Sequence, residues 1–267
     1  MKSLPRSSRR RNAIRWFEDE DLYQISSAVD DRESEFSQIL GPAFALDRFE
    51  RLFGRPARSV LDAGCGSGAM LQEFKRLGVV NCHGFDPSTQ AVRMAECSSE
   101  IVCWVGEAEE ASTYDHLTVQ PDVIVVHLTL ALWSDPVQGL INLVSVLPEE
   151  GLIYVMDLSS DAEGLIKAGR NELECDYLRD QIDSSFNLTE IQGVLAMAAP
   201  GLEIETGNGP IGGFNLPDQK AQELLMGFRT MAALRQISTM AGSVAPDECF
   251  LSGWILKGGE LNERSVS

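Results

Sequence analysis

Short apolar runs alternate with amphipathic stretches along most of the chain beyond residue 54. Seven runs have the length and composition of strands, and we expect strands at 58–62, 80–86, 101–105, 122–127, 152–157, 202–205 and 250–256. Between them the pattern predicts helices at 69–77, 88–97 and 135–147, the last beginning at Pro136 and ending before Pro148. Strands and helices that alternate in this way predict an α/β fold with a parallel sheet.

The remaining segments are additions to this core. Residues 16–53 combine many acids with apolar residues at helical spacing, which predicts a helical lid ahead of the first strand. The start of the chain is rich in arginine and serine, and we expect a disordered tail there, with a transit peptide or a nucleic-acid arm as alternatives. The expected parts are a tail at 1–15, the lid at 16–53, the core at 54–258 with helical insertions at about 159–200 and 208–245, and a second tail at 259–267.

The run from Val60 to Gly68, with the sequence VLDAGCGSG, carries the clearest chemical signal. An apolar strand ends in Asp62, and the alternate glycines that follow let the backbone turn sharply and approach a ligand closely. The glycines alone would also fit a dinucleotide-binding loop. A carboxylate at Asp62, however, would repel a pyrophosphate, whereas it could accept hydrogen bonds from an ammonium group. S-adenosylmethionine, an amino acid with a sulfonium, is such a ligand.

Three later segments add to this loop: 80–88 (VNCHGFDPS), 104–109 (WVGEAE) and 121–128 (PDVIVVHL). Together they resemble the class I S-adenosylmethionine-dependent methyltransferases of small-molecule type, over roughly positions 55–160. The resemblance implies a Rossmann-like, seven-stranded, mostly parallel sheet with helices on both faces. It also implies that an acid at the end of the second strand binds the ribose hydroxyls, that a short acidic turn binds the adenine, and that the fourth strand ends at the methionine part. On this basis the expected cofactor-binding residues are Asp62, Gly64, Cys65, Gly66, Gly68, Asp86, Pro87, Glu107, Ala108, His127 and Leu128.

Each of these residues has a plainer interpretation as well. The glycines could form a tight turn in another kind of nucleotide protein, Asp86 before Pro87 could cap a helix, and Glu107 could be a solvated acid. We expect Cys65 to be a packing residue and not a nucleophile. Because ligands of parallel sheets bind at the carboxyl ends of the strands, Asp157 is expected on the same rim as the other acids.

Methyl transfer is an in-line displacement at a sulfonium carbon. The enzyme must align a nucleophile about 3 Å from that carbon, and it needs a base only if the nucleophile carries a proton. Of the histidines at 83, 116 and 127, only His127 falls on the expected rim, so it is the candidate base, with cofactor positioning or packing as alternatives. Tyr23, in the expected lid, could bind the acceptor or hold the sulfonium by a cation–π contact, unless it only packs the lid.

Composition narrows the class of protein. Forty acids against 22 bases give a formal charge of −18, which opposes binding to a nucleic-acid backbone. The six cysteines lack paired C-x-x-C spacing, so neither a metal site nor a disulfide framework is expected, and free thiols suit a reducing cytoplasm. No apolar run has the length of a membrane span. The expected partner is therefore a small-molecule substrate, without nucleic acid or membrane.

The leading functional hypothesis is a cytoplasmic, biosynthetic methyltransferase that acts on a small-molecule metabolite and releases S-adenosylhomocysteine. One alternative keeps the cofactor but attacks its aminocarboxypropyl arm, by ring closure or by an external amine, and releases methylthioadenosine. A second alternative is a non-catalytic protein that binds the cofactor in a regulatory role.

Overall fold

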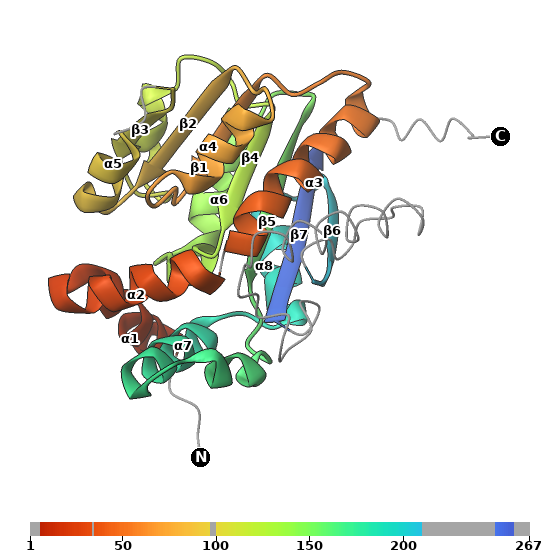
Figure 1. The fold of residues 1–267 in the computed structure, drawn as a ribbon. Coiled ribbons are helices and arrows are strands. Elements are labelled where there is room, and N and C mark those ends of the chain that lie inside the picture. The colour runs from red at the N-terminus through yellow and green to blue at the C-terminus, as the bar shows by residue number, and fades with distance from the viewer. Residues whose placement is uncertain (1–5, 34, 97–99, 210–248, 259–267) are drawn as a thin grey trace.

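The computed structural model describes residues 6–33, 35–96, 100–209 and 249–258, and it confirms the expected α/β fold (Figure 1). A single seven-stranded sheet has the order β3-β2-β1-β4-β5-β7-β6. Its first five strands are parallel, and β7 runs antiparallel to both of its neighbours. All seven expected strands are present, as β1 (Ser59–Ala63), β2 (Asn81–Asp86), β3 (Val102–Val105), β4 (Val123–His127), β5 (Gly151–Leu158), β6 (Glu203–Asn208) and β7 (Phe250–Lys257).

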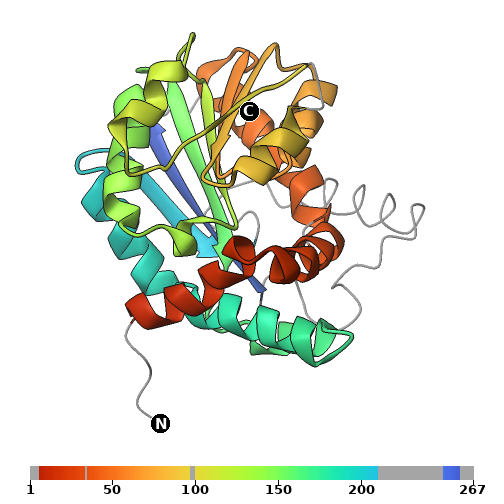
Figure 2. The same ribbon diagram turned by 90° about the vertical axis from the view of Figure 1, so that its left-hand side faces the viewer.

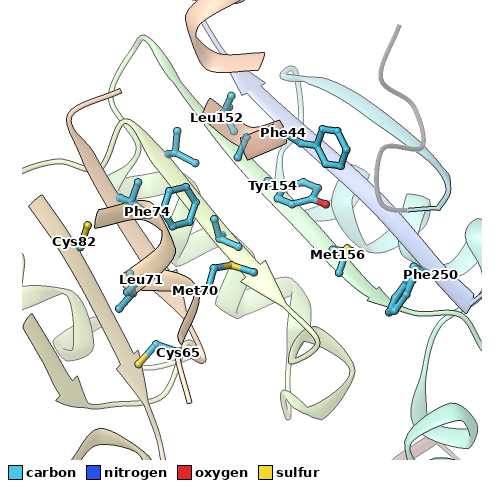
Figure 3. Close-up of a cluster of buried hydrophobic side chains, with 14 of the residues drawn as sticks. Phe44, Cys65, Met70, Leu71, Phe74, Cys82, Leu152, Tyr154, Met156 and Phe250 are labelled. Atoms are coloured by element: carbon cyan, nitrogen blue, oxygen red, sulfur yellow. The ribbon is translucent and has the colours of Figure 1, made fainter. Parts of the chain in front are cut away.

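Helices cover both faces of the sheet, as the family resemblance implies. On one face lie α3 (Glu35–Phe53), α4 (Ala69–Arg76) and α5 (Thr89–Ala95), with α4 packed beside α3. Figure 3 shows Phe44 of α3 near Tyr154 of β5. The other face is covered by α6 (Pro136–Val146) and α8 (Leu188–Ala198). The three helices expected within the core are thus confirmed, although Cys97, at the end of the second one, lies outside the described residues.

The N-terminal helices lie at the end of the sheet where the parallel strands finish (Figures 1 and 2). These are α1 (Arg6–Glu18) and α2 (Glu20–Glu33), and α1 packs against α7 (Glu172–Ser184) from the expected insertion at 159–200. Three short 3-10 helices, η1 (Ala111–His116), η2 (Leu130–Leu132) and η3 (Glu163–Ala168), complete the described elements.

The prediction of a disordered tail at 1–15 is wrong for residues 6–15, which belong to α1. Trp16, at the end of this stretch, is buried against Tyr177 of α7, with ring centroids 5.4 Å apart. Four of the five arginines of α1 bond to the rest of the chain. Among them, Arg9 donates to the backbone oxygen of Asp183 at 2.6 Å, and Arg15 pairs with Asp180 at 3.0 Å. The basic charge of this segment therefore docks the helix against the chain's own carbonyls and acids.

Other parts of the predicted division lie partly outside the described residues. These are residues 1–5, the tail at 259–267, and the insertion at 208–245 apart from its first two residues. Within the described residues, no helix is both long and apolar enough to cross a membrane.

Candidate functional site

The loop between β1 and α4 is held in a shape that only glycine accommodates easily. Gly64, Gly66 and Gly68 have φ angles of 88°, 51° and 78°. A Cβ added to Gly64 would lie 2.6 Å from Thr129 Oγ1, whereas one added to Gly66 would meet no atom within 4 Å. Gly66 therefore presents bare backbone to open space, which is the arrangement a closely approaching ligand requires.

Asp86, at the end of β2, organises this loop. Its Oδ2 accepts a hydrogen bond from the Gly66 backbone N–H at 3.0 Å, and its Oδ1 accepts one from Ser88 at 2.8 Å. Burial raises the pKa of Asp86, and these two bonds oppose the shift because they favour the charged form. Ser88 is the residue that caps α5, accepting from the Ala91 N–H at 3.2 Å. Asp86 is therefore not the helix cap, and each of its oxygens retains a second lone pair for a ligand.

Asp62, at the end of β1, is a buried carboxylate with an unpartnered atom. Only 2% of its surface is exposed, and its Oδ1 has no hydrogen-bond partner among the described residues. Burial, with a smaller contribution from the charge of Asp86, raises the pKa of Asp62 to about 7. A buried, unsatisfied acceptor is uncommon in folded proteins, and it fits a ligand that brings an ammonium donor to this point.

The end of β4 places His127 and Leu128 beside this loop. Burial lowers the pKa of His127 to about 3, so its imidazole is neutral at physiological pH. Leu128 has a φ of 55° and is the one residue other than glycine, among those described, with a positive φ. Such strain is concentrated at functional sites, where the surrounding structure holds it in place.

Asp157 lies at the carboxyl end of β5, on the expected rim, but it does not line the ligand cavity with the other acids. Its Oδ2 accepts from the Ala131 N–H at 3.0 Å and its Oδ1 from the Leu158 N–H at 2.9 Å. The Asp157 carboxylate thus fixes the position of η2 through Ala131 and takes no part in the ligand-binding loop. Burial raises its pKa to about 6, while these backbone bonds oppose the shift.

Behind the loop, Cys65 packs as expected. It is buried above Gly84, where an added Cβ would lie 2.7 Å from the Cys65 Cβ, and its Sγ is 3.9 Å from that of Cys103. The neighbouring thiol and burial raise the pKa of Cys65 far above its usual range, so it stays protonated. Within the described residues, no group of histidines, cysteines and acids could hold a metal ion.

A cavity of about 620 Å³ joins these elements at the carboxyl ends of β1, β2 and β4. Every expected site residue except Gly68 lines it, and Gly68 lies within the loop, where its N–H donates to the Cys65 oxygen at 2.8 Å. The residues it brings together are Tyr23, Asp62, Gly64, Cys65, Gly66, Asp86, Pro87, Glu107, Ala108, His127 and Leu128.

The cavity also has a wall that the sequence interpretation missed. Arg10, Ile14, Phe17 and Glu18 of α1 line it, together with Leu132 and Trp133. Ile14, Phe17 and Glu18 follow Arg10 by four, seven and eight positions, which is the spacing of one helix face. The basic composition of the segment obscures this signal in the sequence.

Comparison with known proteins agrees with this geometry. The chain matches the family model described as "Methyltransferase domain" over residues 38–206. Among curated proteins, it is 28% identical to the ribosomal protein L11 methyltransferase of Erwinia tasmaniensis over 128 residues, which is 46% of this chain and 42% of that protein.

Solved structures extend the likeness to nearly the whole chain. The plantazolicin methyltransferase BamL, in complex with a triazolic desmethylPZN analog and SAH, is 27% identical and superposes with a TM-score of 0.79, covering 94% of this chain and 96% of that one. The plantazolicin methyltransferase BpumL in complex with SAH is also 27% identical, with a TM-score of 0.77 and coverage of 94% and 95%. SAH is S-adenosylhomocysteine, the demethylated product of the cofactor that the acid-and-glycine loop predicts. The chain therefore belongs to the methyltransferase-domain family, with the class I fold and S-adenosylmethionine as its cofactor.

Proposed function

We propose that this enzyme transfers a methyl group from S-adenosylmethionine to a peptide-derived compound that carries heteroaromatic rings. The observation that carries the proposal is the single cavity that combines the acid-and-glycine cradle with an apolar, aromatic wall of Ile14, Phe17, Tyr23, Leu132 and Trp133. The volume of the cavity, about 620 Å³, is in the usual range for protein sites that bind drug-sized small molecules.

The choice of acceptor class is supported by the structures most like this chain. BamL and BpumL act on plantazolicin, a peptide natural product, and were solved with azole-bearing analogs of it. Their similarity covers 94–95% of this chain, so it extends well beyond the 38–206 segment that the family model matches. This acceptor class replaces the broader expectation of a small-molecule metabolite.

The cradle residues would hold the cofactor in one orientation. The unpartnered Oδ1 of Asp62 would accept from the ammonium group, and Asp86, beyond its two backbone bonds, would accept from the ribose hydroxyls. Gly64, Cys65 and Gly66 would form the floor of the cradle, with Gly68 supporting it from within the loop. Pro87, Glu107 and Ala108 would lie along the nucleoside, and Leu128 along the methionine part. The bound cofactor supplies an electrophilic methyl group on its sulfonium.

The remaining residues would orient the acceptor and exclude water. His127 is neutral, so it would accept a hydrogen bond from the acceptor or position the cofactor, but with a pKa of about 3 it would be a weak proton acceptor. Tyr23 would contact the acceptor or the sulfonium from α2. Rate enhancement would then come mainly from alignment and desolvation of the nucleophile, which is enough for an in-line displacement.

Mass spectrometry tests the proposal. The protein is incubated with S-adenosylmethionine alone, then with the triazolic desmethylPZN analog and with a panel of small amines and phenols. We expect a methylated azole-bearing product and S-adenosylhomocysteine. Methylation of only the small compounds would overturn the acceptor class. Methylthioadenosine formed without an acceptor would instead establish attack on the aminocarboxypropyl arm, and cofactor binding without turnover across the panel would favour a regulatory role.

A further inference from the structure

Arg10 is the only cationic side chain among the described residues that line the cavity. The other charged residues there are the acids Glu18, Asp62, Asp86, Glu107 and Glu109. In a chain with a formal charge of −18, a guanidinium at this position changes what the cavity can bind, because every other charged group lining it would repel an anion.

One atom of Arg10 is already fixed by the protein. Its Nε donates to the backbone oxygen of Leu132 at 2.6 Å, which holds the guanidinium against η2. That is the one hydrogen bond Arg10 makes among the described residues, and it forms no ion pair with them. The terminal nitrogens, with four N–H donors, remain for a ligand, and the plane of the guanidinium is set in advance by the Leu132 bond.

The position of Arg10 differs from that of the cofactor-binding acids. Asp86 ends β2 and Glu107 follows β3, and both strands lie on one side of β1. Arg10 is attached to η2, which follows β4 and packs against β5, on the other side of β1. The cavity residues on that side include the apolar and aromatic Ile14, Leu132 and Trp133. Two acids also line it there: Glu18 on α1, and Glu109, which accepts from Ser134 next to Trp133.

From this placement, and resting on the proposed function, we infer that Arg10 determines acceptor specificity by binding a carboxylate of the acceptor. The apolar wall would hold the ring-bearing part while the terminal nitrogens of Arg10 take the two carboxylate oxygens. The methionine part of S-adenosylmethionine also carries a carboxylate that Arg10 could bind. The test must therefore distinguish the carboxylate of the acceptor from the carboxylate of the cofactor.

The test uses benzoate as a probe, with benzamide as a ligand of the same shape but without charge. Cofactor binding is measured first, by calorimetry with S-adenosylhomocysteine, so that a failure of the proposed function is seen independently. Probe binding to the S-adenosylhomocysteine-saturated protein is then measured by ligand-observed NMR. We expect benzoate to bind wild type about tenfold more tightly than benzamide, the scale of one charge-assisted interaction.

Three variants assign the preference to one side chain. Arg10→Gln should lose the preference for benzoate over benzamide while keeping its affinity for S-adenosylhomocysteine. Arg10→Lys keeps the positive charge but lacks the planar guanidinium that binds both carboxylate oxygens, so it should keep only part of the preference. Arg9→Gln is the matched control, because Arg9 also ties α1 to a backbone carbonyl, that of Asp183, but does not line the cavity. It should behave like wild type.

The inference fails under any of three results. Equal binding of benzoate and benzamide to wild type would show that no carboxylate is recognised. A large loss of S-adenosylhomocysteine affinity in Arg10→Gln, with benzoate binding unchanged, would assign Arg10 to the cofactor's carboxylate. Loss of the preference in Arg9→Gln as well would trace the effect to docking of α1 and not to the guanidinium of Arg10.

Discussion

The carboxylate of Asp86 and the backbone N–H of Gly66 are joined by a hydrogen bond of 3.0 Å, which links the end of β2 to the glycine loop after β1. One side chain therefore shapes the loop and offers lone pairs to the ligand that the loop receives. The two roles make Asp86 more costly to lose than a residue that only contacts the ligand.

Replacing Asp86 with alanine should weaken binding of S-adenosylhomocysteine by about 1.5–3 kcal/mol, the scale of hydrogen bonds to a charged group. Isothermal titration calorimetry measures the change. Glu149→Ala is the charge-matched control, because the Glu149 side chain is 91% exposed and lies outside the cavity. Equal affinities in wild type and Asp86→Ala would remove Asp86 from the binding site.

Cofactor binding should depend on pH through Asp62. With a pKa of about 7 in the ligand-free protein, this carboxyl is largely protonated at pH 6 and largely charged at pH 8. A bound ammonium favours the charged form, so it lowers the pKa and binding releases a proton. Affinity for S-adenosylhomocysteine should therefore rise from pH 6 toward pH 8, by at most about tenfold per unit, and level off above the pKa.

Calorimetry at several pH values, in buffers of different ionisation enthalpy, counts the protons released. Asp62→Asn supplies the control, since it cannot titrate and should show weaker binding with a flatter pH dependence. A wild-type affinity that is constant between pH 6 and 8 would contradict the assignment of Asp62 as the ammonium partner.

Two glycines of the same loop should respond differently to an added methyl group. At Gly66 the Cβ meets no atom of the protein, so Gly66→Ala should cost only the strain of a positive φ, about 1 kcal/mol, but should weaken cofactor binding by tenfold or more. At Gly64 the Cβ would overlap Thr129, so Gly64→Ala should destabilise the fold as well, by about 1–3 kcal/mol beyond that strain. Thermal unfolding and calorimetry together separate the two cases; similar unfolding temperatures would contradict the difference in packing.

Most of the fold, and the position of the cofactor cradle, could be predicted because their signals are local. A strand that ends in an acid, alternate glycines with positive φ, and a helix directly after them all lie within residues 59–76. The antiparallel direction of β7 has no comparable signal, because an apolar run is the same in either direction. It depends on pairing with β5, about a hundred positions earlier in the chain.

Phe17 and Tyr23 of the acceptor wall lie in the expected lid at 16–53, but the part of α1 that lines the cavity before residue 16 could not be predicted, for a similar reason. Arginines in a serine-containing segment usually indicate a solvated tail, and nothing nearby in the sequence offers them a partner. Their actual partners are distant backbone oxygens, such as that of Leu132, 122 positions away from Arg10. Asp157 lies on the predicted rim, but periodicity does not reveal that its carboxylate is occupied by the N–H groups of Ala131 and Leu158.

His127→Ala should slow turnover more than it weakens cofactor binding, because the imidazole lines the cavity beside the expected methyl position. Comparison of kcat with the affinity for S-adenosylhomocysteine tests this. Because the pKa of His127 is about 3, the imidazole does not titrate near pH 6.5. The pH profile of wild-type kcat should therefore contain no inflection near pH 6.5 that depends on His127, and removing His127 should not change its shape there. Such an inflection would establish His127 as a titrating base, and equal losses in turnover and binding would make it a cofactor-binding residue only.

Docking of α1 should depend on Asp180, whose Oδ2 accepts from Trp16 Nε1 at 2.9 Å and pairs with Arg15 at 3.0 Å. Asp180→Ala should lower the free energy of unfolding by about 1–2 kcal/mol, because it leaves the indole N–H of the buried Trp16 without its acceptor. Trypsin should then cut at the arginines of α1 faster than in wild type. Asp183→Ala, on the same helix, removes an exposed carboxylate but keeps the backbone oxygen that binds Arg9, so it should be cut at the wild-type rate. Cleavage of wild type and Asp180→Ala at the same rate would contradict the role of Asp180 in docking α1.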